Sequence, residues 1–447
     1  MTRLRIERGS LPSLERLALL GYLLLQELVV LGLKTPRFPD SKTYMHLDLT
    51  GGALRLPTVP LLYKIFPSDD SRIAAQVVLA AAAWWIVARV ASTLIGDRRV
   101  GLALRGVLLL LGLVGAVASW NSIVLSESAT ISLTVLAIAA WMRFAVKPTS
   151  GRAAVAVAVT LVWTLARQPN VLFGLALTVA VLIALAASRI DTRLRVAMAV
   201  ALVCVNVIGL VEVSRNQTLS KNALEEVLQI RILPNADWTS WFVSHGMPYS
   251  PAVARYAGVP AEEGEPLPEF VQWLHTKGEH AYVQFILEHP KYLLLDPLPY
   301  FTGEGASLHH PSSTPFGALQ PNPTPSMLSP SVNYGRSRSV MPSVVESLLW
   351  DSRGWGDVLT LAALAFGAAI LAVSRHGVDR RFVVPGIVAV LVVPEGYILW
   401  LSGGEATGEL DRLSMVTAVS VRVALWTILA IAVDRLVAAR TTRQVSA

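Results

Sequence analysis

Long runs of apolar residues constrain this chain more than any other feature of its sequence. A run of about 18 or more such residues is long enough to cross the hydrocarbon core of a bilayer. Ten segments are predicted to cross it, of which the fifth and sixth are short: 14–33, 73–95, 100–119, 123–146, 153–166, 171–187, 196–213, 358–373, 382–402 and 413–433. The composition agrees, because 53% of the residues are hydrophobic and only 15% are charged. We therefore expect an all-α integral membrane protein with about ten transmembrane helices.

Basic residues gather in every second turn between the apolar runs. They occur in "GDRRVGLALR", "RFAVKPTSGR", "SRIDTRLR" and "SRHGVDRR", and again in the tail "DRLVAARTTR". Because cytoplasmic loops of membrane proteins carry an excess of Lys and Arg, this alternation predicts a multi-pass protein of the cytoplasmic membrane with both termini in the cytoplasm. The same bias accounts for the formal net charge of +7, so no nucleic-acid partner is expected.

The chain is predicted to have three parts. Residues 1–213 form an N-terminal membrane module that includes a first outer loop, 34–72, and residues 356–447 form the C-terminal membrane helices. Residues 214–355 form a helical outer domain, periplasmic or extracellular. Within it "EHAYVQFILEHPKYLLLD" is amphipathic and is expected to lie along the membrane surface. The Pro- and Ser-rich "HHPSSTPFGALQPNPTPSMLSP" is expected to be an extended, mobile loop.

A polar stretch follows directly after the first apolar run. The sequence "FPDSKTYMHLDLTGGALRLPTVP" contains, among other polar residues, Asp40, Lys42, Tyr44, Asp48 and Arg55. A carboxylate at the membrane–water boundary can accept a proton from a hydroxyl group while a lipid-borne substrate stays in the bilayer. The alternative is a solvated loop with ordinary surface charges.

The order of a helix, then "PDSKTYMHLD", then "RLPTVPLL" resembles the first outer loop of GT-C class glycosyltransferases. These multi-pass enzymes use polyprenyl-phosphate-linked sugars. Other segments are similar to that class as well: "SWNSIVLSES", "RILPNADWTSWFVSHGMP", "ILEHPKYLL" and "GELDRLS". The resemblance covers most of the chain. It implies an inverting transfer of a hexosyl or pentosyl group from the lipid donor to an acceptor hydroxyl on the outer face of the membrane.

The resemblance also implies roles for individual residues. The general base of the family is an aspartate early in the first outer loop, which matches Asp40, with Asp48 as the reserve. Metal-using members often have two acidic residues one apart at this point, where this chain has Asp40-Ser41-Lys42. No cofactor is therefore expected, and a divalent metal stays an open alternative. The implied partners are a polyprenyl-phosphate-linked sugar, a cell-envelope glycan or lipid acceptor, and membrane lipids.

Cations are needed where the phosphate leaves, because negative charge builds up on it as the sugar–phosphate bond breaks. Arg412, at the start of the last helix, is the first candidate, followed by Arg167 between two short helices and then by Arg55 and Lys42. Arginine suits this role because its planar fork binds two phosphate oxygens at once. The alternative for each residue is a structural or lipid-headgroup contact.

Three further polar residues are candidates for positioning the acceptor: Glu127, Tyr44 and His289. Glu127 could instead hold a cationic side chain, and a structural polar contact at the helix end is the alternative to both roles. Glu395 and Arg422 fall at similar depth on consecutive antiparallel helices. Because a charge inside a bilayer usually pairs or faces a cavity, we predict a structural ion pair between them.

Three other functions stay open from the sequence. A transporter or lipid flippase would need a polar path across the bilayer, but intramembrane charges are few and no inverted helix-break repeat is visible. A glycan polymerase or ligase would use a diphosphate-linked lipid donor and would rely on arginines and a histidine in the outer loops, here His280 or His289. The third is a catalytically inactive relative that serves as an assembly partner.

Overall fold

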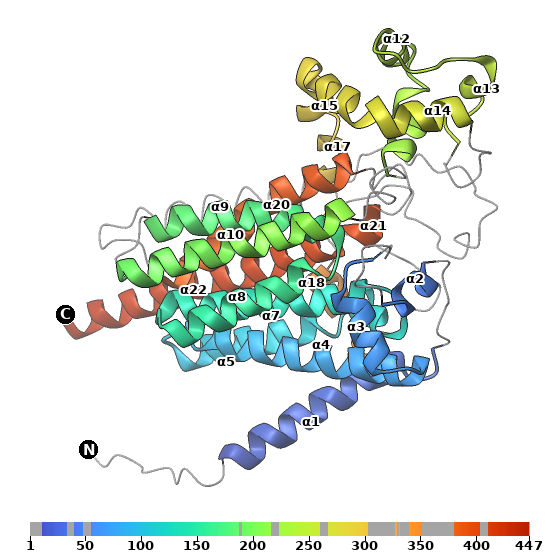
Figure 1. Cartoon of the computed structure of the whole chain (residues 1–447). Coiled ribbons are helices and arrows are strands. Elements are labelled where there is room, and N and C mark those ends of the chain that lie inside the picture. The colour runs from blue at the N-terminus through green and yellow to red at the C-terminus, as the bar shows by residue number, and fades with distance from the viewer. Residues whose placement is uncertain are drawn as a thin grey trace.

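The computed structural model confirms a helical fold for the part of the chain that it describes. This part comprises residues 11–33, 40–47, 55–186, 190–215, 223–259, 267–302, 327–328, 330, 339–350, 380–402 and 410–446. All of its regular secondary structure is helical, and these residues contain no strand. Long helices lie side by side in a bundle, and shorter helices stand beyond one end of it (Figure 1).

Within the described residues the bundle contains α1 (Leu11–Val30), α4 (Asp69–Ser92), α5 (Arg98–Leu111), α7 (Glu127–Val146), α8 (Ser150–Thr164), α9 (Gln168–Ala186), α10 (Thr192–Arg215), α20 (Arg380–Leu401) and α22 (Met415–Ser446). Helix α7 is central, since it packs against α4, α8, α20 and α22, and most of its residues are buried. Helices α9 and α10 instead expose large apolar side chains such as Ile183 and Val200. An apolar outer surface of this kind fits contact with lipid.

In the part of the chain that the structure describes, six helices are long and apolar enough to cross a membrane, or seven if one bent pair counts as a single span. Helix α8 has only 15 residues, and the 20 residues of α1 include the charged Glu15, Arg16 and Glu27. The predicted span 358–373 lies outside the described residues. The structure therefore supports several apolar spans but does not confirm the predicted number of ten.

The third predicted span is bent, so the expectation of one continuous helix over 100–119 is wrong. Helix α5 ends at Leu111, and α6 (Gly115–Ala118) with η1 (Ser119–Ser122) continues at an angle of 54° to it. Backbone groups freed by such a break need partners where water is absent. Side chains from distant helices supply them: Gln26 donates to the Gly112 carbonyl at 2.8 Å, Tyr22 to Leu109 at 3.0 Å, and Gln76 to Asn121 at 3.0 Å.

The bend also depends on a close approach at Gly112. A Cβ atom at this position would lie closer than 3.0 Å to both the Tyr22 hydroxyl and the Trp84 ring. Only glycine leaves room for these two side chains at the end of α5. Tyr22, which donates a hydrogen bond to a backbone carbonyl at the break, therefore fits there only because residue 112 is glycine.

The shorter helices beyond the bundle are α12 (Ala236–Ser244), α13 (Pro251–Ala254), α14 (Pro268–Trp273), α15 (Glu279–Glu288), α16 (Pro290–Leu294) and α17 (Leu298–Thr302). Aromatic rings form their core: Trp238, Trp241 and Tyr292 surround Phe285 with ring centroids 5.0–5.9 Å apart. Helices are thus confirmed in this segment, with a break at Pro290. Its side of the membrane stays a prediction, and most of the predicted mobile loop lies outside the described residues.

A buried arginine joins this segment to the bundle. Arg231, in the turn η2 (Leu228–Ile232), donates to the Tyr292 hydroxyl at 3.0 Å and to the Trp400 carbonyl at the end of α20. Its guanidinium lies 3.9 Å from the centroid of the Trp400 ring. Carbonyl oxygens and an aromatic face thus compensate the buried charge.

Arg422 is held in the same manner, so the predicted ion pair with Glu395 is wrong. It donates to the carbonyls of Leu328 at 2.5 Å and Ala418 at 3.1 Å and to that of Trp350, and it lies 4.2 Å from the Trp350 ring centroid. No ion pair joins Arg422 and Glu395, although both belong to the described residues. A hydropathy pattern does not show which backbone carbonyls will be available as acceptors. Here carbonyl oxygens accept hydrogen bonds from Arg422, and the predicted partner Glu395 does not.

Candidate functional site

Five charged side chains meet at the end of the bundle where α2 (Ser41–Met45), α3 (Thr58–Ile65) and α21 (Leu410–Leu413) lie (Figure 1). We call Asp40, Arg55, Glu127, Arg167 and Arg412 the ion network. Arg412 bridges its two carboxylates, with 3.5 Å to Asp40 Oδ2 and 3.0 Å to Glu127 Oε1. Arg55 lies 2.6 Å from Asp40 Oδ1, and Arg167 lies 3.2 Å from Glu127 Oε1.

Helix α2 and Arg55 are bound to the start of α7 by a chain of contacts. Arg55 Nε donates to the Thr43 hydroxyl at 2.8 Å, and its guanidinium lies 4.7 Å from the centroid of the Tyr44 ring. The Tyr44 hydroxyl in turn donates to Ser126 Oγ at 3.0 Å. Since Ser126 directly precedes Glu127, these contacts fix the position of Asp40 relative to the buried carboxylate.

Exposure varies across the ion network. The Glu127 side chain is 1% exposed, and the side chains of Arg412 and Arg167 are 6% and 8% exposed. Arg55 is 17% exposed and Asp40 is 27% exposed. Asp40 is therefore the carboxylate that a solvent-borne molecule can reach, while Glu127 serves as the buried anion beneath it.

Among the described residues, the ion network brings three guanidinium groups against two carboxylates. Neither oxygen of Glu127 forms a hydrogen bond of good geometry with a described residue, although two guanidinium groups touch Oε1. The negative charge of Glu127 thus holds Arg412 and Arg167 close together, although its oxygens form no well-aligned hydrogen bonds with described residues.

Tyr63 and Gln76 support the turn before Glu127, and the sequence did not single them out. The Tyr63 hydroxyl lies 2.5 Å from the Leu125 carbonyl and 2.7 Å from Gln76 Oε1. Burial, with a further contribution from the Glu127 charge, raises the pKa of Tyr63 well above its usual value. The phenol therefore stays neutral and acts as a donor. Gln76 is a polar residue inside the second predicted span, and this was the sequence feature that could have indicated its contact with Tyr63.

Three predicted site residues do not join the ion network in the described part of the chain. Lys42 is exposed on α2 and forms no ion pair with the described residues. His289 lies among the aromatic rings beyond the bundle, where its Nδ1 is 2.9 Å from the Phe285 carbonyl and its ring stacks on Phe285 at 4.2 Å. Asp48 lies outside the described residues. The roles predicted for these three residues therefore remain untested.

A metal site is not formed by the residues that the structure describes, since no three His, Cys, Asp or Glu side chains converge among them. Both carboxylates of the ion network already contact arginines. The expectation that the protein works without a cofactor stays a prediction. What the described geometry offers is an anion site formed by guanidinium groups beside an accessible carboxylate.

Comparisons with known proteins give no family for this chain. No protein-family model matches it, and no curated protein matches it. Among solved structures, it is similar to the archaeal oligosaccharyltransferase AglB from Archaeoglobus fulgidus, solved with an inhibitory peptide and a dolichol-phosphate. The TM-score is 0.45 at 13% sequence identity, and the match covers 98% of this chain and 52% of that one. The chain thus spans about half the length of that enzyme.

Proposed function

We propose that the protein is a GT-C-type glycosyltransferase that moves a hexosyl or pentosyl group from a polyprenyl-phosphate donor to an acceptor hydroxyl. The acceptor is a glycan or lipid of the cell envelope, and the reaction takes place at the outer face of the cytoplasmic membrane. The observation that carries this proposal is the ion network, in which the accessible carboxylate of Asp40 lies against two arginines and a third lies beyond Glu127.

In the proposed reaction Asp40 acts as the general base. Its carboxylate accepts the proton of the acceptor hydroxyl while that oxygen attacks the anomeric carbon on the face opposite the phosphate. The bond from the anomeric carbon to the phosphate oxygen breaks, and the electron pair leaves with the phosphate. The configuration at the anomeric carbon is inverted. Holding both substrates in line at the membrane boundary contributes a large part of the rate.

The arginines have the charge that this reaction requires. A sugar linked through one phosphate to a lipid carries a single negative charge, and guanidinium groups are suited to bind it. A second negative charge develops on the phosphate as the sugar departs, and preorganised guanidinium groups stabilise it. Arg412 is best placed for this, because it touches both Asp40 and Glu127.

The test is sugar transfer by purified protein in liposomes, with labelled polyprenyl-monophosphate sugars as donors. We expect Asp40→Asn to lower the rate by about 10²- to 10⁴-fold, since the amide cannot accept the proton. Asp69→Asn is the matched control. Asp69 is the first residue of α4, and its carboxylate pairs with Arg72 at 2.8 Å. Full activity of Asp40→Asn, together with loss in His280→Ala or His289→Ala, would instead favour the polymerase or ligase mechanism.

A further inference from the structure

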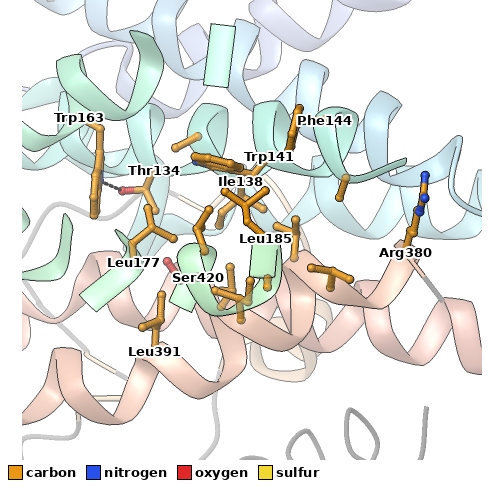
Figure 2. A pocket seen from close by; sticks show the side chains of 18 of the residues that line it. Thr134, Ile138, Trp141, Phe144, Trp163, Leu177, Leu185, Arg380, Leu391 and Ser420 are labelled. Atoms are coloured by element: carbon orange, nitrogen blue, oxygen red, sulfur yellow. Dashed lines mark hydrogen bonds between the residues drawn. The ribbon is translucent and has the colours of Figure 1, made fainter. Parts of the chain in front are cut away.

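A second feature of the bundle lies away from the ion network. It is a cavity of about 130 Å³ between α7, α8, α9, α20 and α22. Figure 2 shows part of its lining, which is mostly apolar and includes Ile138, Trp141, Phe144, Leu185 and Leu391. The polar residues of the lining are Thr134, Glu395, Ser420 and Arg380. The apolar stretch between them suits a hydrocarbon, because apolar cavities of this size do not hold ordered water.

The cavity runs towards the end of the bundle opposite to the ion network. On α7 its lining extends from Thr134 to Ala145, a length of about 16 Å at the usual helix rise, and the ion network begins at Glu127. Arg380 and Phe144 lie at one end of the cavity, and Thr134 and Leu391 lie at the other (Figure 2). A phosphate bound at Arg412 therefore does not reach the end at Arg380.

Arg380 gives this end of the cavity a positive charge. It is the exposed first residue of α20 and belongs to the lining. Within the described part of the chain Arg380 has no ion pair, whereas the adjacent Arg381 pairs with Asp434 at 2.7 Å and donates to the Leu94 carbonyl at 3.0 Å. One of the two consecutive arginines therefore has a structural role, and the other presents a guanidinium at the end of an apolar channel.

We propose that this cavity binds one acyl chain of an anionic membrane phospholipid, with its phosphate held by Arg380. The guanidinium fork matches phosphate oxygens, and the surrounding bilayer supplies the hydrocarbon chain. The site is independent of the proposed glycosyl transfer, because its cation and its lining share no residue with the ion network. Its occupant comes from the leaflet at the Arg380 end of the bundle.

The experiment uses the full chain in nanodiscs that contain a trace of a phospholipid with a photoreactive group in one acyl chain. Labelled peptides are identified by mass spectrometry. With a phosphatidylglycerol probe we expect labelling of α9 and α20 inside the cavity, and Arg380→Gln should lower it by about tenfold. Arg99→Gln is the matched control, since Arg99 is also exposed but does not line the cavity. Ala184→Phe, which adds a ring to the cavity lining, should abolish the same labels.

Three results would overturn the proposal. The first is equal labelling by phosphatidylglycerol and phosphatidylcholine probes, unchanged in Arg380→Gln. The second is labelling in Ala184→Phe as strong as in the unaltered protein, provided that thermal unfolding shows both to be folded. The third is displacement of the label by polyprenyl phosphate at a lower concentration than by phosphatidylglycerol, which would assign the site to the carrier lipid.

Discussion

Two groups of buried arginines in this protein are neutralised in different ways. In the ion network, Arg412 and Arg167 contact the carboxylate of Glu127. Where the shorter helices beyond the bundle and the C-terminal helices join, Arg231 and Arg422 donate to backbone carbonyls and lie over the rings of Trp400 and Trp350. Contacts with carboxylates dominate at the first place, and contacts with carbonyls and aromatic faces are prominent at the second.

This difference distinguishes the proposed binding site from a structural joint. Carbonyls and indole rings belong to the packed framework, so Arg231 and Arg422 cannot change partners without disturbing it. Glu127 contacts its arginines without hydrogen bonds of good geometry among the described residues. An incoming phosphate with oxygens in the right directions can therefore compete for them. The following experiments test this distinction, from the largest expected effect to the smallest.

The largest effect is expected for Glu127→Gln. Removing the charge of Glu127 takes from Arg167 the carboxylate that it contacts and leaves Arg412 with Asp40 at 3.5 Å. Loss of one partner from a buried pair typically costs about 3–5 kcal/mol of stability. Denaturant unfolding of the purified protein measures this loss. Glu15→Gln is the control, because Glu15 is 42% exposed and pairs with Arg89 at 3.3 Å. Added polyprenyl phosphate should restore part of the stability, and its failure to do so would argue against an anion site.

Arg412→Gln should affect transfer itself. Losing one preorganised donor to the developing phosphate charge typically lowers the rate about 10²- to 10³-fold. The measurement is the transfer rate at saturating donor. For comparison, Arg422→Gln should reduce the yield of folded protein while leaving the rate per folded molecule near its original value. Equal loss of rate in both variants would contradict the distinction between the two groups of arginines.

A smaller effect on stability is expected for Arg231→Met. The Trp400 carbonyl would lose this donor, whereas the Tyr292 hydroxyl would keep its hydrogen bond with Tyr282. Leaving a buried polar group without its partner typically costs about 1–3 kcal/mol. The free energy of unfolding is compared with that of Arg255→Met, in which an exposed arginine of the same segment is replaced. A lower transfer rate per folded Arg231→Met molecule would show that this joint also takes part in the reaction.

The smallest change is expected on removing divalent cations. If the three guanidinium groups supply the charge that the leaving phosphate needs, then transfer should continue at nearly the same rate in excess chelator. The transfer assay with and without chelator checks this expectation. Loss of activity that returns with added Mg²⁺ or Mn²⁺ would show that a cation shares this role with the arginines.

The sequence predicted the helices and most members of the site, but not their pairing. The run 73–95 corresponds to α4 (Asp69–Ser92) and the run 123–146 to α7 (Glu127–Val146), because apolar length is a local property of the chain. Glu127, Arg167 and Arg412 were singled out by their places at the ends of predicted helices, and Asp40 and Arg55 by their places in the polar stretch after the first apolar run. A cationic partner for Glu127 was one of the possibilities left open, but which arginines contact it was not predicted.

The bend after α5 and the partners of Arg422 could not be predicted for the same reason. The bend depends on Gln26 and Gln76, which reach it from two other helices. Arg422 depends on the carbonyls of Leu328 and Trp350, which look like any other backbone group in the sequence. In each case the deciding contact joins positions far apart in the chain.

The sequence by itself determined that this protein is helical and rich in apolar spans, because each span is set by about twenty consecutive residues. It also determined which charges lie at the ends of those spans. Only the tertiary structure decided that Asp40, Glu127 and three arginines form one network, while Lys42 and His289 lie elsewhere. The physical reason is that a charge is neutralised by whatever helix packing brings within a few ångströms, and packing joins residues from distant parts of the chain.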